Sequence, residues 1–187
     1  MKRILMLACA VLLSWNANAL EVAGVKLPDT AQVGNANLQL NGAGIRTKLF
    51  FKIYVAALYL PQRQKAADTV VAEEREHRVA LHILRELSSA KLLGAFNDAI
   101  EANHSAAELS ALEPQLRQMA QIFDTVKEVK PGDVISLDYL PGSGTQISVN
   151  GTARGTIAGL AFNRALLRIW LGNKPAQDDL KKELLGG

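Results

Sequence analysis

Arg46 and Tyr54 are the two side chains whose types and positions best fit the binding of a carboxylate. Arg46 lies between a glycine-rich stretch and the most apolar segment of the chain. A guanidinium buried there without a counter-charge is costly, so it either pairs with an internal carboxylate or receives an anionic ligand. The hydroxyl of Tyr54 would add a directional hydrogen-bond donor beside that charged group. The pair therefore predicts recognition of a small carboxylate.

The distance along the chain restricts this pairing. Eight residues of one continuous strand cover about 26 Å. Arg46 and Tyr54 can therefore meet at one headgroup only if the chain bends or bulges around residues 49–51.

Other kinds of catalytic or ligand-binding chemistry find little support in the sequence. His77, His82 and His104 have no metal-ligand spacing with each other or with carboxylates. The chain contains no G-x-S-x-G motif. A glycine pattern at 42–47 begins like a dinucleotide-binding loop, but Thr47 stands where the third glycine is needed. The sequence predicts neither a metal site nor a bound cofactor.

Residues 1–19 have the pattern of a cleaved secretory signal peptide. Lys2 and Arg3 precede an apolar run at 4–13, and Ala17-Asn18-Ala19 matches a small-x-small cleavage site. Polar residues interrupt the run before it reaches the roughly 20 apolar residues of a transmembrane span. We therefore expect residues 20–187 to be exported to a bacterial periplasm without a stable membrane anchor.

The composition is that of a globular protein. The chain has 187 residues, of which 49% are hydrophobic and 21% charged, and this excludes disordered, collagenous and coiled-coil proteins. The length predicts one folded domain over residues 20–187. The net charge is +3, and two of the basic residues that contribute to it, Lys2 and Arg3, belong to the signal segment. The remaining charge gives no reason to expect a nucleic-acid partner.

Alternating apolar and polar residues predict strands in both halves of the chain. They lie at 22–27, 36–40, 78–85, 134–140, 145–149 and 152–157. The longest β-type segment is 45–60, and its second half, 53–60, is apolar on both faces, as expected of a central strand covered on each side. The sequence Asn41-Gly42-Ala43-Gly44 predicts a turn before this segment.

Apolar residues at helical spacing predict helices between and after the strands. One runs from residue 88 or 89 to 103, and Ser105 with Glu108 forms a capping box for the next. Pro114 within this second pattern predicts a kink or a break into two helices.

The last part of the chain predicts two further helices, one at 159–171 and one after Pro175. Strands, helices, strands and helices therefore follow one another in that order. This order predicts an α+β fold in which the helices pack against one face of a largely antiparallel sheet.

The segment NGAGIRTKLFFKIYVAALYLP, residues 41–61, resembles the characteristic hairpin of the chalcone isomerase superfamily. A looser similarity extends to PGDVISLDYLPGSGTQISVNG at 131–151 and AFNRALLRIWLGNKPAQDDLKKELLG at 161–186. The chain is most similar to the bacterial chalcone-isomerase-like exported proteins. The resemblance implies an open-faced antiparallel sheet backed by a layer of helices, with a ligand cleft between them.

Two functions occur in that superfamily, and the resemblance relates both to this chain. The plant isomerases use an Arg, a Thr and a helix with Tyr-x-x-Lys-x-x-x-Asn, whereas the fatty-acid-binding relatives use the Arg with a Tyr in place of the Thr. Arg46 matches the Arg, and Tyr54 matches the position of the Thr. The helix motif reads Ser88-x-x-Lys91-x-x-x-Ala95, so only its lysine is retained. These departures favour carboxylate binding over isomerisation.

The leading hypothesis is a non-catalytic periplasmic protein that binds a fatty acid or a similar small apolar carboxylate through Arg46 and Tyr54. The walls of its cleft are expected to include Phe50, Phe51, Leu92, Phe96 and Ile100.

Two alternatives remain open at this point. One is a weak isomerase or lyase acting on an enone, with Arg46 as oxyanion stabiliser and Lys91 assisting. The other is a chaperone-like or interaction protein whose cleft is vestigial. A large apolar cleft with a buried Arg46 favours a ligand, whereas a filled cleft with Arg46 paired to an internal Glu or Asp favours the interaction protein.

Overall fold

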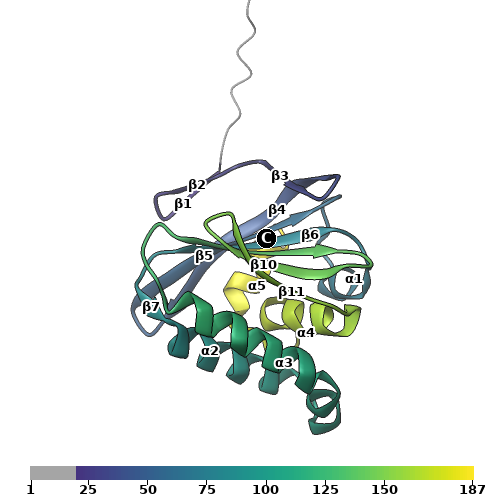
Figure 1. Cartoon of the computed structure of the whole chain (residues 1–187). Coiled ribbons are helices and arrows are strands. Elements are labelled where there is room, and N and C mark those ends of the chain that lie inside the picture. The colour runs from purple at the N-terminus through teal and green to yellow at the C-terminus, as the bar shows by residue number, and fades with distance from the viewer. Residues whose placement is uncertain (1–19) are drawn as a thin grey trace, which may run out of the picture.

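A seven-stranded antiparallel sheet forms the centre of the computed structural model, which describes residues 20–187. The predicted signal peptide, residues 1–19, lies outside the described residues. From one edge to the other the strands are β11 (Thr152–Ile157), β10 (Gly144–Val149), β9 (Val134–Leu140), β6 (His77–Ile83), β5 (Phe51–Leu60), β4 (Ala36–Lys48) and β3 (Thr30–Val33). The sheet curls over its helices (Figure 1).

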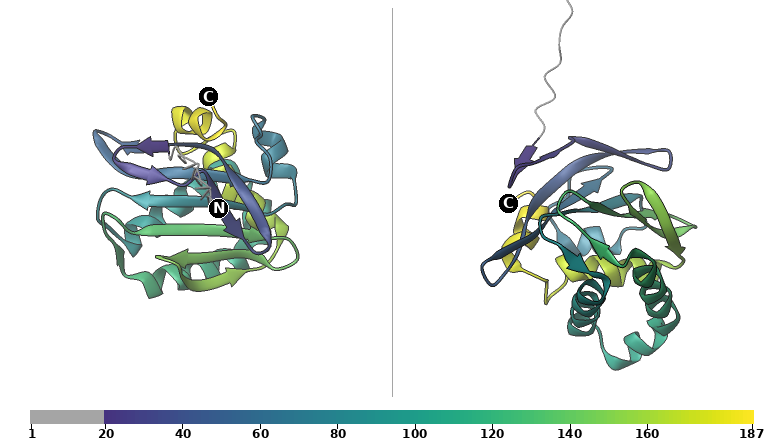
Figure 2. Two further views of the ribbon diagram at one scale, coloured as in Figure 1. Left: turned by 90° about the horizontal axis from the view of Figure 1, so that it is seen from above. Right: turned by 60° about the vertical axis from the view of Figure 1, so that its left-hand side comes forward.

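Helices cover one face of this sheet, and a small hairpin covers part of the other. The helices are α1 (Ala67–Ala72), α2 (Ser89–Asn103), α3 (Ala106–Val126), α4 (Leu160–Leu171) and α5 (Asp178–Leu184). The hairpin of β1 (Leu20–Val22) and β2 (Val25–Leu27) lies on the opposite side, as the two views of Figure 2 show. Strands β7 (Leu87–Ser88) and β8 (Glu128–Val129) pair separately near the start of α2. The predicted α+β class is confirmed.

Strand β5 is covered on both faces, as its sequence predicts. The side chains of Ala56 and Leu58 belong to the core shared with the helices, whereas those of Val55 and Tyr59 belong to the core under the β1–β2 hairpin. These side chains are at most 2% exposed. Burial on both sides explains why the segment lacks the alternation of a half-exposed strand.

The predicted β segment at 45–60 is a hairpin and not one continuous strand. Strand β4 ends at Lys48 and β5 begins at Phe51, so the chain reverses through Leu49 and Phe50. Leu49 adopts a positive φ of 57° at this reversal. The turn contains none of the Gly, Pro or Asn residues that mark most hairpins, so its local composition does not indicate the reversal, which only the resemblance to the superfamily hairpin implies.

The turn predicted at residues 41–44 is wrong, because these residues lie inside β4. The register of β4 against β5 shifts between Leu40 and Gly42, so the strand bulges there without ending. A Cβ atom on Gly42 would overlap the main-chain carbonyl oxygen of Glu183 at the end of α5, and one on Gly44 would overlap the side chain of Glu183. The two glycines therefore allow α5 to approach the strand closely.

The helical predictions hold in most respects. Ser88 accepts a hydrogen bond from the backbone of Lys91 and caps α2, and Ser105 with Glu108 forms the expected capping box of α3. Helix α3 nevertheless runs through Pro114 as one helix, so the predicted break into two does not occur. The short helix α1 was not predicted.

Among residues 20–187, the structure contains no helix of the length and hydrophobicity needed to span a bilayer.

Candidate functional site

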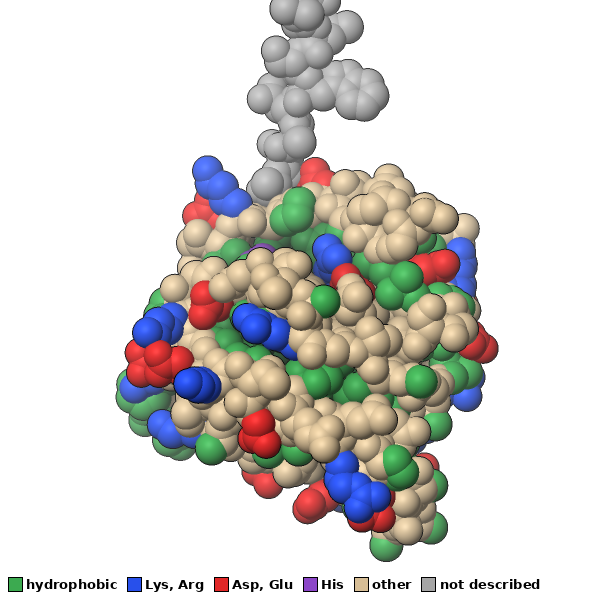
Figure 3. All heavy atoms as spheres, viewed as in Figure 1, with side chains coloured by type: hydrophobic (Ala, Val, Ile, Leu, Met, Phe, Trp, Pro, Cys, Tyr) green, Lys and Arg blue, Asp and Glu red, His purple; other side chains and the backbone are tan. Residues whose placement is uncertain are grey.

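A cavity of about 680 Å³ lies between the sheet and the helices. Side chains from β4, β5, β6, β9 and β10 form one wall, and side chains from α2, α3 and α4 form the other. This volume is in the range of small-molecule binding sites. Hydrophobic side chains appear in the hollow between the sheet and helices α2 and α3 in Figure 3.

The hairpin places Arg46 and Tyr54 directly opposite each other. Their Cα atoms are partners in the antiparallel register of β4 and β5, and opposite residues project from the same face of a sheet. The register shifts immediately afterwards, since Thr47 pairs with Lys52 and Ile53 has no partner on β4. The turn at residues 49–50 therefore supplies the bend that a shared headgroup site requires.

Arg46 is held at the cavity by backbone and amide groups. Its Nη1 donates to the carbonyl of Thr47 at 2.7 Å and to Oε1 of Gln177 at 3.3 Å. The same Oε1 accepts the backbone N–H of Thr47 at 2.9 Å, while Nε2 of Gln177 donates to the carbonyl of Ile45 at 3.3 Å. Gln177 thus clamps the end of β4. Within residues 20–187, no carboxylate forms an ion pair with Arg46.

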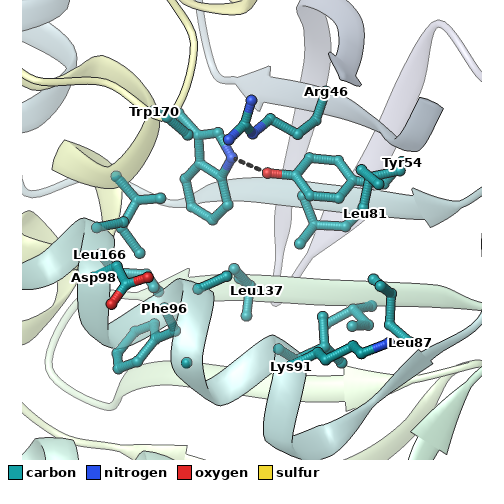
Figure 4. A pocket seen from close by; sticks show the side chains of 18 of the residues that line it. Arg46, Tyr54, Leu81, Leu87, Lys91, Phe96, Asp98, Leu137, Leu166 and Trp170 are labelled. Carbon is teal, nitrogen blue, oxygen red and sulfur yellow. Dashed lines mark hydrogen bonds between the residues drawn. The ribbon is translucent and has the colours of Figure 1, made fainter. Parts of the chain in front are cut away.

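Tyr54 presents its hydroxyl to the cavity beside Arg46. The indole Nε1 of Trp170 donates to this hydroxyl at 3.1 Å, and Figure 4 shows the three side chains on one side of the cavity. Within the described chain the hydroxyl donates its own proton to no protein acceptor. Burial raises the pKa of Tyr54 above 10.0, and the Trp170 hydrogen bond and the charge of Arg46 offset only part of this increase. The hydroxyl is therefore a neutral donor directed at the cavity.

Helix α2 brings three of the other sequence candidates to the opposite wall. Lys91, Leu92 and Phe96 all line the cavity, and Figure 4 shows Lys91 and Phe96 across from the Arg46 side. Ile100 is 1% exposed and belongs to the core behind this wall.

Phe50 and Phe51 do not line the cavity, which corrects the sequence prediction. Phe50 is 95% exposed and Phe51 is 48% exposed, and both lie at the reversal between β4 and β5. The prediction rested on their apolar side chains, which suit the wall of a ligand cleft. In the hairpin the same residues form the tip and point away from the core.

Trp170 and Gln177 are site residues that the sequence interpretation missed. Trp170 falls in the helix predicted at 159–171 and Gln177 in the helix predicted after Pro175, and neither received a role at the site. Each contacts its partner across more than 100 residues of sequence. No local pattern identifies them, because their roles depend on where α4 and the start of α5 meet the β4–β5 hairpin.

The acidic and histidine residues of the described part of the chain do not form a cluster that could hold a metal ion.

Comparison with known proteins identifies the family to which the chain belongs. The family model described as chalcone isomerase-like matches residues 19–186. The chain belongs to the chalcone isomerase-like family. The comparison with curated protein sequences gives no match.

A solved structure of this fold belongs to a fatty-acid binding protein of Arabidopsis thaliana. Its similarity has a TM-score of 0.66 and covers 87% of this chain and 92% of that chain, at 15% sequence identity. The two proteins share the curled antiparallel sheet with helices on one face. The resemblance to the chalcone isomerase superfamily, and the fold that it implies, are thereby confirmed.

Proposed function

We propose that this chalcone isomerase-like protein is a non-catalytic carrier of a fatty acid or a similar small apolar carboxylate. The observation that carries the proposal is the pairing of Arg46, which has no carboxylate partner within residues 20–187, with the free hydroxyl donor of Tyr54 at the end of an apolar cavity. A guanidinium and a phenol together match the two oxygens of a carboxylate. The fold shared with a plant fatty-acid binding protein supports the same ligand class.

The direction of the apolar tail follows from the lining of the cavity. Beyond Tyr54 on β5, the wall continues through Leu81 on β6 and Leu137 on β9 to Ile147 on β10. Three steps between neighbouring strands cover about 14 Å, roughly the length of an extended acyl chain of about twelve carbons. We infer that the tail runs across the strands, beneath the sheet and towards α3.

Export to the periplasm is part of this proposal. It rests on the signal-peptide pattern of residues 1–19. Expression of the full chain in a bacterium, followed by intact mass measurement of the periplasmic protein, is expected to give a chain that begins at Leu20. A chain found only in the cytoplasm with residues 1–19 retained would contradict the localisation.

Affinity is expected to rise with acyl length and then to level off. Each added methylene contributes about 0.8 kcal/mol, or roughly a fourfold increase in affinity, while it enters the cavity. The increase should end near twelve to fourteen carbons, where the tail reaches the far wall. Calorimetric titration with saturated fatty acids of increasing length, below their micelle concentrations, measures this dependence. Affinity that is independent of length would show that the tail lies outside the cavity.

Ligand affinity is expected to be constant from neutral pH to pH 10. The raised pKa of Tyr54 keeps its hydroxyl protonated through this window, so the donor to the carboxylate is retained. Only above pH 10 should ionisation of Tyr54 replace the donor with a negative charge and weaken binding. Tyr54→Phe should bind about fivefold more weakly at every pH, because one hydrogen bond is lost. A loss of affinity below pH 10 in the wild type, but not in Tyr54→Phe, would contradict this assignment.

A weak isomerase remains the second candidate, because Lys91 lines the same cavity as Arg46. In such an enzyme Arg46 would stabilise the developing oxyanion and Lys91 would assist. Turnover of a chalcone or another enone by the wild type, reduced in Lys91→Met, would support it. The third candidate, an interaction protein with a vestigial cleft, is disfavoured by the open cavity and by the lack of a carboxylate partner for Arg46 within residues 20–187.

The experiment that tests the carrier function is native mass spectrometry of the protein purified gently from the periplasm. Organic extraction then identifies any bound molecule. We expect a fatty acid bound in a one-to-one ratio with the protein. An empty protein that also fails to bind added fatty acids would overturn the proposal.

A further inference from the structure

The tip of the β4–β5 hairpin, residues 49–51, exposes a continuous apolar surface. Leu49 is 82% exposed, Phe50 95% and Phe51 48%. The remaining exposed large hydrophobic residue among residues 20–187 is Leu20, at 44%. Leu49 also holds a positive φ, which L-residues with large side chains rarely adopt. Adjacent exposed apolar side chains of this size indicate a surface that contacts something other than water.

Basic side chains surround the hairpin tip. Lys48 and Lys52 flank it directly and are exposed, and the guanidinium of Arg85 lies 4.0 Å above the ring centre of Phe51. The segment 45–54 contains no acidic residue. The carboxylate of Glu86, next to Arg85 in the chain, interacts with Lys130. An apolar tip within a ring of long basic side chains fits a bilayer surface that carries anionic headgroups.

The hairpin tip also lies beside the opening of the cavity. Lys48, the neighbour of Leu49, lines the cavity, as do the exposed side chains of Lys91 and Lys174. Figure 1 shows this end of β4 and β5 on the same side of the molecule as β7 and the start of α2. A membrane in contact with the tip would therefore face the opening through which a ligand enters.

We propose that the hairpin tip docks this protein on an anionic lipid bilayer. Leu49 and Phe50 enter the boundary between headgroups and acyl chains, while Lys48, Lys52 and Arg85 contact the phosphates. Docking of this kind does not require a bound ligand. Exchange of a fatty acid with the bilayer is its consequence and rests on the proposed function.

Flotation with lipid vesicles tests the docking surface. The full chain and its variants are expressed and purified in the same way. They are mixed with phosphatidylcholine vesicles with or without about 30% phosphatidylglycerol, at about 0.1 M salt. The wild type is expected to bind the anionic vesicles and to be released by higher salt. Phe50→Ser should reduce binding about tenfold because the inserted ring is lost.

The charge and its position are tested by matched variants. The double variant Lys48→Glu with Lys52→Glu should also lose at least about tenfold in vesicle binding. Leu20→Ser and Lys26→Glu change an exposed leucine and an exposed lysine outside the hairpin tip, so both should bind as the wild type does. Phe50→Trp should bind like the wild type and show a blue shift of its fluorescence on anionic vesicles.

The outcomes separate docking from carrier function. Arg46→Met should bind vesicles normally even where it has lost its fatty acid, so loss of the ligand site alone leaves docking intact. Absence of binding to anionic vesicles, or equal binding by all tip and control variants, would overturn the proposal. Self-association of the wild type that Phe50→Ser abolishes, without vesicle binding, would identify the tip as a protein interface instead.

Discussion

Arg46→Met is expected to weaken carboxylate binding by at least about two orders of magnitude while the fold is retained. The ligand would lose its charged partner, and its carboxylate would have to leave water without compensation. The fold should persist because, within residues 20–187, the side chain of Arg46 makes hydrogen bonds only to Thr47 and Gln177, and Oε1 of Gln177 keeps its bond from the backbone of Thr47. Calorimetric titration with dodecanoate, together with thermal unfolding, measures both properties.

Lys48→Met provides the matched control for Arg46→Met. It removes a positive charge that also lines the cavity, two residues away and exposed to solvent. Because exposed charges are screened, its affinity should fall only about two- to threefold. Equal losses in the two variants would mean that the general positive potential attracts the ligand. Unaltered affinity in Arg46→Met would remove the proposed binding site.

Gly42→Ala is expected to destabilise the protein by about 3 kcal/mol. The added methyl group would overlap main-chain atoms, which cannot rotate away as a side chain can. The new Cβ atom would overlap the carbonyl oxygen of Glu183, so the end of α5 would have to move away from β4. That movement also strains the hydrogen bond from the side chain of Asn41 to the carbonyl of Leu184, which is 2.7 Å long. Denaturant unfolding measures the change in the free energy of unfolding.

Two other glycines serve as comparisons for Gly42→Ala. A Cβ atom on Gly44 would overlap the side chain of Glu183, including its Cβ atom, which rotation of the side chain does not move, so Gly44→Ala should also destabilise the protein, by about 1–3 kcal/mol. Gly94 lies within α2 with nothing near its added Cβ atom, so Gly94→Ala should stabilise the helix by about 0.5–1 kcal/mol. If Gly42→Ala and Gly44→Ala were no more damaging than Gly94→Ala, the close approach of α5 would not be the reason for the two glycines.

Sequence patterns predict an element well when its signals are local. The helix caps at Ser88 and Ser105 and the meander of β9, β10 and β11 depend on residues within a few positions of each other, and all occur as predicted. The glycines at 42 and 44 show the opposite case. Their segment has the composition of a turn, but the glycines are needed because a helix about 140 residues further along the chain packs closely against them.

The residues of the candidate site also differ in whether local sequence patterns predict them. Arg46 and Tyr54 could be singled out because a charged residue and a phenol stand beside an apolar segment. Their direct pairing depends on a turn at residues 49–50 with none of the usual turn residues, and this same turn moves Phe50 and Phe51 out of the cleft. Trp170 and Gln177 could not be predicted, because only the assembled sheet and helices bring them to Tyr54 and Arg46.

The clamp formed by Gln177 has a consequence for the order in which the protein matures. It joins Arg46 to a residue 131 positions later, one of the longest loop closures in the chain. Contacts at such separations form late in folding, because their entropy cost must be met before they stabilise anything. The sheet can assemble while the anion-binding end of the cavity is still incomplete. Ligand affinity is therefore expected to develop late in folding, and a chain that ends before Gln177 should hold its ligand more weakly than the full chain.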